Sequence, residues 1–204
     1  GQAVHRLLER LPPAHAAQAS PWSAADLAAV TTEFGLDAGQ CEAAHTMALG
    51  ILRGQGAWCF DPEALSWAGT EVGIQVGGRS LRIDRLVQLR DSAHWWVLDY
   101  KSNALGAHDA DYTQAAMEAA MLEHRYDVQA AYYRDLYRDI TGETRAWQWI
   151  CVEDQAPYAV AVYQLDTDSL DKGSTTWQSW IRQWMVCEDT DSWPGYNGDS
   201  IQII

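Results

Sequence analysis

The sequence predicts a mixed α/β domain in which helices flank a central β-sheet. Apolar side chains recur at helical spacing before residue 54. Runs rich in β-branched and aromatic residues, bounded by turn residues, fill 70–102 and 145–165. Helical patterns return between and after these runs. The fold class is therefore α/β of the α+β type, with a mixed sheet made of a three-stranded meander, helices and a C-terminal strand pair.

Stop and cap signals define the N-terminal part. Proline cannot continue a helix, Ser is a favoured N-cap and Gly a favoured stop. The predicted elements are a helix over 2–11 ended by Pro12-Pro13, a loop over 14–21, a helix from the Ser23 cap to Phe34 with Gly35 as its stop, a helix over 38–53 and a short strand over 57–60.

The rest of the chain alternates strands and helices. Strand 70–76 turns at Gly77-Gly78 into the next strand, as expected for a hairpin. The further predicted elements are strands 80–89 and 95–102, a loop over 103–111, helices 112–123 and 126–140, the strand pair 145–152 and 159–165, and a helix over 168–186.

Composition restricts the class of protein. The chain has 204 residues, 11 tryptophans and a net charge of −14, from 14 basic and 28 acidic residues. Its length fits one domain with a substantial core. No window approaches 18 uninterrupted apolar residues and no signal-peptide layout opens the chain, so we expect a cytoplasmic protein without membrane contact. The acidic balance disfavours tight nucleic-acid binding, which rests on Lys and Arg at phosphates.

The segment LRIDRLVQLRDSAHWWVLDYKS holds the strongest chemical signal. A tight turn around Asp91-Ser92 places Asp84 opposite Asp99, and Lys101 shares a face with Asp99. Two carboxylates this close repel each other unless a proton or a cation lies between them, and a hard divalent cation such as Mg²⁺ suits oxygen ligands. The amine can offset anionic charge that builds up during a reaction.

The same residues also fit an ordinary surface hairpin. In that arrangement Asp84 pairs with Arg82 or Arg85, and Asp99 pairs with Lys101. Exposed pairs of this kind are common and weak. The residues alone leave both interpretations open.

The ordered set of His5, Asp84, Asp99-x-Lys101 and Gln129-x-x-x-Tyr133 resembles the D…(D/E)-x-K signature of the PD-(D/E)XK nuclease superfamily. The likeness is strongest to the RecB/AddA-type nuclease domain of bacterial double-strand-break repair helicase-nucleases. It runs from GQAVHRLLERLP through LDYKSNALG to HRYDVQAAYY. The resemblance implies a restriction-endonuclease-like core and Mg²⁺-dependent hydrolysis of DNA phosphodiesters, with Mn²⁺ able to substitute.

The resemblance also implies roles for individual residues. His5, Asp84, Asp99 and the backbone carbonyl of Tyr100 would hold the metal. Lys101 would act on the attacking water and the transition state, and Gln129 and Tyr133 would hold the strand or orient catalytic groups. Glu71 stands where related domains often carry an acidic residue, although it also fits a charged strand end.

The domain expectation is a single nuclease domain over 1–204. It divides into an N-terminal helical part (1–56), a catalytic core (57–165) and a C-terminal helix and tail (166–204). The tail resembles RecE-like exodeoxyribonuclease VIII, which leaves open a helicase-linked, stand-alone or ring-forming oligomeric enzyme. The four widely spaced cysteines lack a C-x-x-C pair, so we expect neither a zinc ribbon nor an iron–sulfur cluster.

The expected function is a Mg²⁺-dependent DNA nuclease, an exonuclease in recombination and double-strand-break repair. Its expected partners are linear DNA ends, single- or double-stranded, and a helicase or recombination protein. Two alternatives remain. One is a non-catalytic DNA-end-binding or protein-docking module on the same fold. The other is an RNA-directed or structure-specific nuclease, because the metal site acts on the phosphate.

Overall fold

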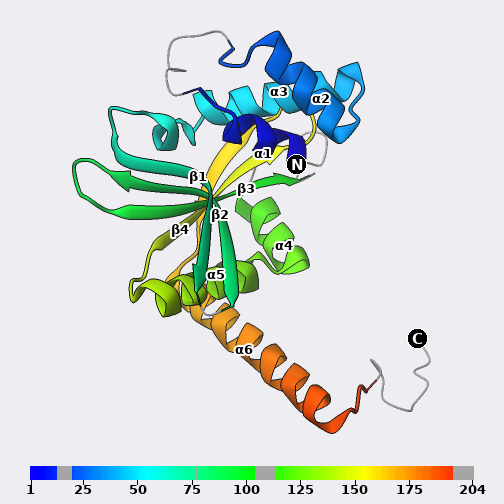
Figure 1. The fold of residues 1–204 in the computed structure, drawn as a ribbon, viewed down its shortest axis with the longest axis vertical. Helices are drawn as coiled ribbons and strands as arrows, with labels where there is room; N and C mark the ends of the chain where they lie inside the picture. The colour runs from blue at the N-terminus through cyan, green and yellow to red at the C-terminus, as the bar shows by residue number, and fades with distance from the viewer. Residues whose placement is uncertain (13–19, 77, 104–113, 195–204) are drawn as a thin grey trace.

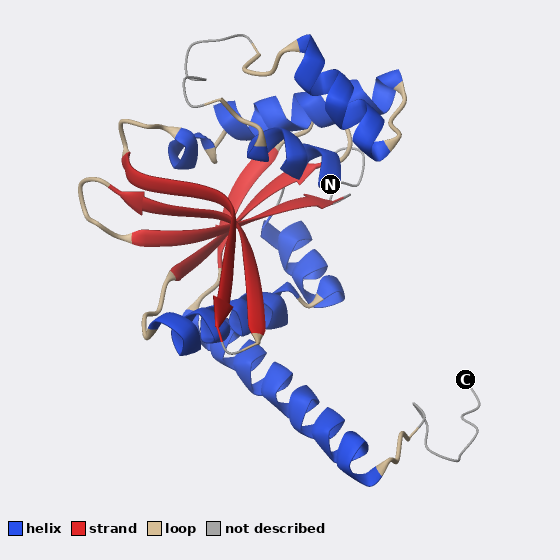
Figure 2. Ribbon diagram, viewed as in Figure 1, coloured by secondary structure: helices blue, strands red, loops and turns tan. Residues whose placement is uncertain are grey.

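The computed structural model describes residues 1–12, 20–76, 78–103 and 114–194. A five-stranded sheet lies between two groups of helices (Figure 1, Figure 2). On one side of it lie α1 (Gln2–Glu9), α2 (Ala24–Phe34) and α3 (Ala38–Arg53). On the other lie α4 (Gln114–His124), α5 (Tyr126–Thr141) and the start of α6 (Thr167–Thr190). None of the described helices combines the length and apolar character needed to cross a membrane.

The sheet is mixed, as predicted. Its strands follow chain order, with β1 (Leu65–Val76), β2 (Arg79–Leu89), β3 (Trp95–Asn103), β4 (Ala146–Glu153) and β5 (Val160–Gln164). Only the β3–β4 pair among the described strands is parallel. Parallel neighbours need a long crossover, and the segment with α4 and α5 provides it. The meander and the strand pair therefore form one continuous sheet.

Two hydrophobic clusters fill the space between the layers. The first joins α1–α3 to the sheet and includes Leu7, Leu8 and Ile51. The second joins α4, α5 and α6 to the opposite side and includes Trp147 and Trp149. The tryptophan-rich composition is thus partly explained by large rings that fill the second cluster.

The predicted bounds of α2 and α3 are confirmed, and capping boxes at Ser23 and Asp37 explain both starts. The strand expected over 57–60 is wrong. Ala57–Phe60 is a short 3₁₀ helix, η1, in which Cys59 Sγ donates to Gly56 O. Apolar content alone does not separate a short strand from a buried helical turn. The loops expected over 14–21 and 103–111 fall largely outside the described residues.

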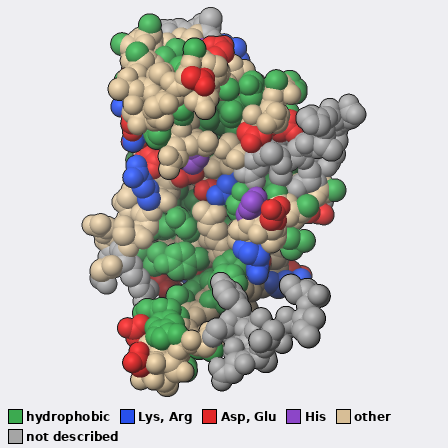
Figure 3. Space-filling view, turned by 90° about the vertical axis from the view of Figure 1, so that its right-hand side faces the viewer, with side chains coloured by type: hydrophobic (Ala, Val, Ile, Leu, Met, Phe, Trp, Pro, Cys, Tyr) green, Lys and Arg blue, Asp and Glu red, His purple; other side chains and the backbone are tan. Residues whose placement is uncertain are grey.

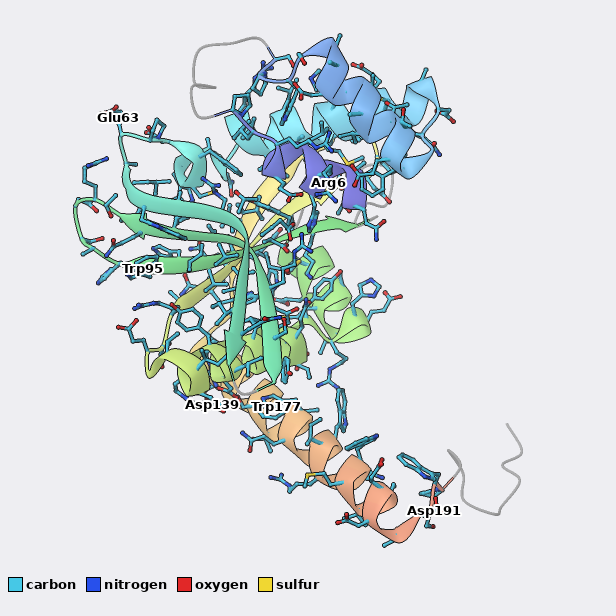
Figure 4. The ribbon with its side chains drawn as sticks, in the orientation of Figure 1. Arg6, Glu63, Trp95, Asp139, Trp177 and Asp191 are labelled. Atoms are coloured by element: carbon cyan, nitrogen blue, oxygen red, sulfur yellow. The ribbon has the colours of Figure 1, made fainter. Side chains whose placement is uncertain are left out.

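α6 packs against α5 through a buried polar network. Asp135 on α5 is 2% exposed. It accepts hydrogen bonds from Ser174 and, at 3.0 Å, from Trp177 Nε1, and it pairs with Arg134 at 3.1 Å. Beyond Trp177, labelled in Figure 4, α6 leaves the body of the protein. Its outer half exposes large apolar side chains, among them Trp180 and Trp184.

Gly173 permits the close approach of these two helices. A Cβ at Gly173 would lie 2.4 Å from Asp127 O and 2.9 Å from Ala131 Cβ. Gly173→Ala should therefore push α6 off α5 and lower the free energy of unfolding by about 1–3 kcal/mol, as overpacking does. Urea denaturation measures this loss.

Gly39→Ala is the matched control. Gly39 lies near the exposed start of α3, and a Cβ there would have its nearest neighbour at 3.4 Å. Alanine is the better helix former, so this variant should be unchanged or more stable by up to about 1 kcal/mol. Equal stability of the two variants would contradict the close approach of α5 and α6.

Candidate active site

The β2–β3 hairpin brings Asp84 and Asp99 together. Arg85 pairs with Leu98, the register predicted from the turn. The next position places Asp84 level with Asp99, where the backbone ladder ends. There Asp84 Oδ2 accepts a hydrogen bond from Tyr100 N at 2.9 Å. The side-chain carboxylate of Asp84 thus takes the place of a backbone acceptor in the ladder and is held against β3.

His5 reaches the same point from α1. Its Nδ1 lies 3.6 Å from Asp84 Oδ2, and its Nε2 lies 3.2 Å from Tyr100 O. Burial lowers the pKa of His5, although the carboxylate of Asp99 opposes this shift. The imidazole is therefore neutral at pH 7, which is the form that offers a lone pair to a metal ion.

Glu71 completes the group from β1. The residues on either side of it pair with β2, and Glu71 lies between them, level with Asp84. Its φ of 53° is left-handed, which is uncommon for a residue with a side chain. Its carboxylate forms an ion pair with Arg82. Strained backbone of this kind persists where the surroundings enforce it, often at functional sites.

His5, Glu71 and Asp84 form a candidate cation site. Each offers a ligand atom, and these atoms all lie within 4.8 Å of one another. They line a pocket of about 520 Å³ between α1 and the sheet. Two carboxylates with one neutral imidazole suit Mg²⁺ or Mn²⁺ better than a soft metal. This donor set therefore fits the expected divalent ion.

Lys101 lies beside this cluster and is held by two partners. Its Nζ is 2.6 Å from Asp99 Oδ2 and donates to Gln129 Oε1 of α5 at 2.8 Å. It also lies 4.7 Å from the centre of the Tyr126 ring. The side chains of Asp99 and Lys101 are only 11% and 13% exposed, so the pair is not an ordinary surface ion pair.

Burial perturbs the acidic groups. It raises the pKa of Asp99 to about 7, with Lys101 opposing the shift and Asp84 adding to it. Burial also raises the pKa of Asp84, against the hydrogen bond from Tyr100 N. Two neighbouring buried carboxyl groups retain a proton more readily than isolated ones, unless a cation replaces it.

The two aromatic candidates differ in position. Burial raises the pKa of Tyr133, and the nearby Asp99 and Asp84 raise it further. This places Tyr133 near the carboxylates, with its ring 5.6 Å from that of Trp147. Tyr100 is buried, with its backbone N donating to Asp84 and its backbone O beside His5 Nε2, and its ring packs edge-on against the His5 ring, with the ring centres 5.4 Å apart.

The structure thus brings all the candidate residues of the sequence into one region. Figure 3 shows acidic, basic and histidine side chains gathered near the middle of one face, above a largely hydrophobic area. The surface-hairpin alternative is found only in part. Asp84 accepts from the β3 backbone and Arg82 pairs with Glu71, whereas the expected Asp99–Lys101 pair is present but largely shielded from solvent. Glu71 was outside the expected ligand set, and its position on the strand before the hairpin was its only sequence signal.

Comparison with known proteins identifies the family. The family model described as "PDDEXK-like domain of unknown function (DUF3799)" matches residues 81–203, more than half of the chain. The chain belongs to this family. The match contains Asp84, Asp99, Lys101, Gln129 and Tyr133, whereas His5 and Glu71 lie before it. The resemblance to the PD-(D/E)XK nuclease superfamily is therefore confirmed.

One curated protein and one solved structure are similar to this PDDEXK-like domain. This chain is 52% identical over 74 residues to the RecB subunit of the RecBCD enzyme of Escherichia coli (strain K12). The match covers 36% of this chain and 6% of RecB. The crystal structure of a candidate exonuclease from Eubacterium rectale is similar in fold, with a TM-score of 0.54 and 12% identity. That match covers 83% of this chain and 64% of the other, just under two thirds. The family match and the identity to RecB support a nuclease, and the solved structure supports the fold.

The raised pKa of Asp99 predicts pH-dependent metal binding by the PDDEXK-like domain. Below pH 7 a proton on Asp99 competes with a cation at the adjoining ligands, and above pH 7 that proton is gone. Affinity for Mn²⁺ should rise by up to about tenfold per pH unit between pH 6 and 7 and level off above pH 8. Calorimetry at pH 6, 7 and 8 measures this, and an affinity that does not change with pH would contradict it.

Glu71 provides a second prediction. Glu71→Gln removes one anionic ligand and should weaken Mn²⁺ binding by about tenfold or more. Glu63→Gln is the control, since Glu63 is exposed and far from Arg6 and α1 in Figure 4. Equal Mn²⁺ affinities of the two variants in calorimetry would exclude Glu71 from the site.

Proposed function

We propose that this domain is a Mg²⁺-dependent DNA nuclease that hydrolyses phosphodiester bonds, acting as an exonuclease on linear ends in recombination and double-strand-break repair. One observation carries the proposal. The ligand atoms of His5, Glu71 and Asp84 gather within 4.8 Å of one another, beside a lysine held by Asp99 and Gln129. A structural role alone does not require half-buried acidic groups to be crowded in this way.

His5, Glu71 and Asp84 would hold the metal ion, with Tyr100 O and Asp99 as further donors. When bound, the ion neutralises charge on the phosphate and lowers the pKa of its water. In the reaction, a water oxygen forms a bond to phosphorus while the bond to one ester oxygen breaks, and that oxygen leaves with a proton. Asp84 is already oriented for its role by Tyr100 N and His5.

Lys101 would stabilise the negative charge that develops on the phosphate oxygens. Asp99 and Gln129 fix its ammonium group, so little reorganisation is needed during the reaction. Gln129 acts as a positioning residue in this scheme, because its Oε1 accepts a hydrogen bond from the Lys101 ammonium group. Tyr133 lies close to Asp84 and Asp99 and would contact the DNA strand.

The acidic surface shapes how DNA would bind. Arg6 and Arg82 line the pocket of the cation site, but each is paired with glutamate, Arg6 with Glu9 and Glu33, and Arg82 with Glu71. Much of the attraction for phosphate must then come from the bound metal and Lys101. We expect the isolated domain to bind DNA weakly and with strong salt dependence.

The wider setting is also part of the proposal. Identity to part of RecB, one subunit of the RecBCD enzyme, supports a partner protein, for which we propose a helicase or recombination protein, and a cytoplasmic location is a further part of the proposal. Mn²⁺ is expected to substitute for Mg²⁺, since both prefer oxygen-rich sites.

Lys101→Ala tests the catalytic assignment. It should abolish Mg²⁺-dependent cleavage of end-labelled linear DNA, a loss of at least about a hundredfold, while Mn²⁺ binding in calorimetry is retained. The chain contains only one other lysine, Lys172, which is exposed on α6. Lys172→Ala is thus a matched control and should cleave normally. Retained cleavage by Lys101→Ala would refute the role of Lys101.

The substrate class needs a separate comparison. Linear and closed circular DNA are incubated in Mg²⁺, with EDTA as the negative control. Loss of linear DNA alone supports an exonuclease, whereas cutting of circles removes that interpretation. A protein that binds DNA ends but cleaves neither form, in Mg²⁺ or Mn²⁺, would instead be the non-catalytic end-binding module.

A further inference from the structure

We propose that the outer half of α6 is a docking surface for an amphipathic helix of a partner protein, one with basic residues beside its apolar stripe. This docking surface, which we call the α6 surface, contains the exposed apolar side chains Trp180, Ile181, Trp184 and Met185 and the acidic side chains Glu188 and Asp189. The inference goes beyond the proposed nuclease, because neither a metal ion nor DNA takes part in the contact.

The apolar part of the α6 surface continues the face by which α6 packs against α5. Gly173 and Trp177 lie in the contact with α5. Trp180, Ile181 and Trp184 follow Trp177 by three, four and seven residues, and residues at this spacing share one side of a helix. Beyond Trp177, α6 projects away from the sheet and the other helices (Figure 1). The face that is covered along the first half of the helix is therefore open along the second, where Trp180 and Trp184 are 50% and 52% exposed.

The apolar side chains of the α6 surface have the character of binding anchors. Large apolar patches are rare on the surface of monomeric proteins and mark interaction sites, and tryptophan is enriched among the residues that dominate binding energy. The Trp180 ring is also held in place, since the guanidinium of Arg125 lies 5.4 Å from its centre. Anchors three and four residues apart on one side of a helix fit the apolar stripe of a second helix laid against it.

The charges of the α6 surface favour a basic partner. Glu188 and Asp189 lie in the last turn of α6, which contains no basic residue. The C-terminal end of a helix carries partial negative charge, so carboxylates there are unfavourable unless cations lie near them. Arg182 is the one basic residue in 178–190, and it points away from Trp184, because residues two apart do not face the same side of a helix. Lysine or arginine side chains of a partner would supply the missing cations.

A second copy of this chain is a poorer occupant of the α6 surface. It would carry the same net charge of −14 and the same acidic helix end. The approach of two such chains brings like charge to like charge, which disfavours association. An amphipathic helix with basic flanks instead covers the apolar stripe and neutralises the carboxylates.

Two designed peptides of about 15 residues, long enough to form a helix, test this charge preference with the whole protein. Both have leucine at helical spacing, and the remaining positions are lysine in one peptide and glutamate in the other. In calorimetry at low salt, the lysine peptide should bind at least about tenfold more tightly than the glutamate peptide. Equal binding of the two peptides, or no binding of either, would overturn the α6 surface.

Trp184→Ser tests where the lysine peptide binds. The side chain of Trp184 is half exposed, so its removal spares the core. This variant should bind the lysine peptide at least about tenfold more weakly, as expected for a central anchor, and Trp184→Phe should keep most of the affinity. Leu122→Ser is the matched control, because Leu122 on α4 is 68% exposed, and it should bind like the wild type. Undiminished binding by Trp184→Ser would refute the proposal.

Removal of the two carboxylates tests the acidic part of the surface. Glu188→Gln combined with Asp189→Asn should weaken binding of the lysine peptide at least about threefold, the effect of losing two exposed ion pairs. Glu63→Gln combined with Asp154→Asn removes the same charge from exposed positions outside α6 and should leave the affinity unchanged. Equal losses in the two double variants would mean that only the net charge matters, and would contradict a site on α6.

Two further measurements address the other possible occupants. The wild-type protein should sediment as a monomer, and a dimer that Trp184→Ser abolishes would make a second copy the occupant. A variant without residues 195–204 should bind the lysine peptide like the full chain, and tighter binding would make that segment the occupant. Either result would overturn the proposal. None of these measurements involves cleavage, so their failure leaves the proposed nuclease intact.

Discussion

The contact between Asp84 and the backbone of β3 holds the candidate site together. Asp84 Oδ2 accepts from Tyr100 N where the β2–β3 ladder ends, and the same oxygen faces His5 of α1. This one carboxylate joins the N-terminal helix to the sheet. Asp99 and Lys101, on either side of Tyr100, are placed by the same short stretch of strand. A shift of the hairpin by one residue would turn all these side chains to the opposite face.

Much of this site follows from local sequence patterns. The turn after β2 fixes the register, and the register sets Asp84 level with Asp99. Helical spacing joins Gln129 to Tyr133, and capping residues define α2 and α3. These features depend on neighbours within a few residues, where hydrogen bonding and side-chain direction leave few choices. The family resemblance added His5, whose distance from the aspartates in the chain gives no local signal.

The features that sequence did not predict depend on contacts distant in the chain. Glu71 joins the cluster through a left-handed backbone that β1 adopts between two ladder pairs. The parallel pairing of β3 with β4 depends on a crossover that no short motif encodes. Gly173 reads as an ordinary helical glycine until α5 is placed against it. The 57–60 segment was predicted as a strand from its apolar content alone. Its residues instead contact the core from a short helical turn.

The three proposed ligands come from separate elements, and this has a thermodynamic consequence. His5 belongs to the helical layer, while Glu71 and Asp84 belong to two strands, so the unfolded chain has no such set of ligands in one place. An ion that binds only the native arrangement would link the helical layer that contains α1 to the sheet and stabilise the contact between them. By mass action, a concentration one hundred times the dissociation constant would add about 2.7 kcal/mol to the unfolding free energy. The cation would then govern not only chemistry but also how often the N-terminal helix detaches.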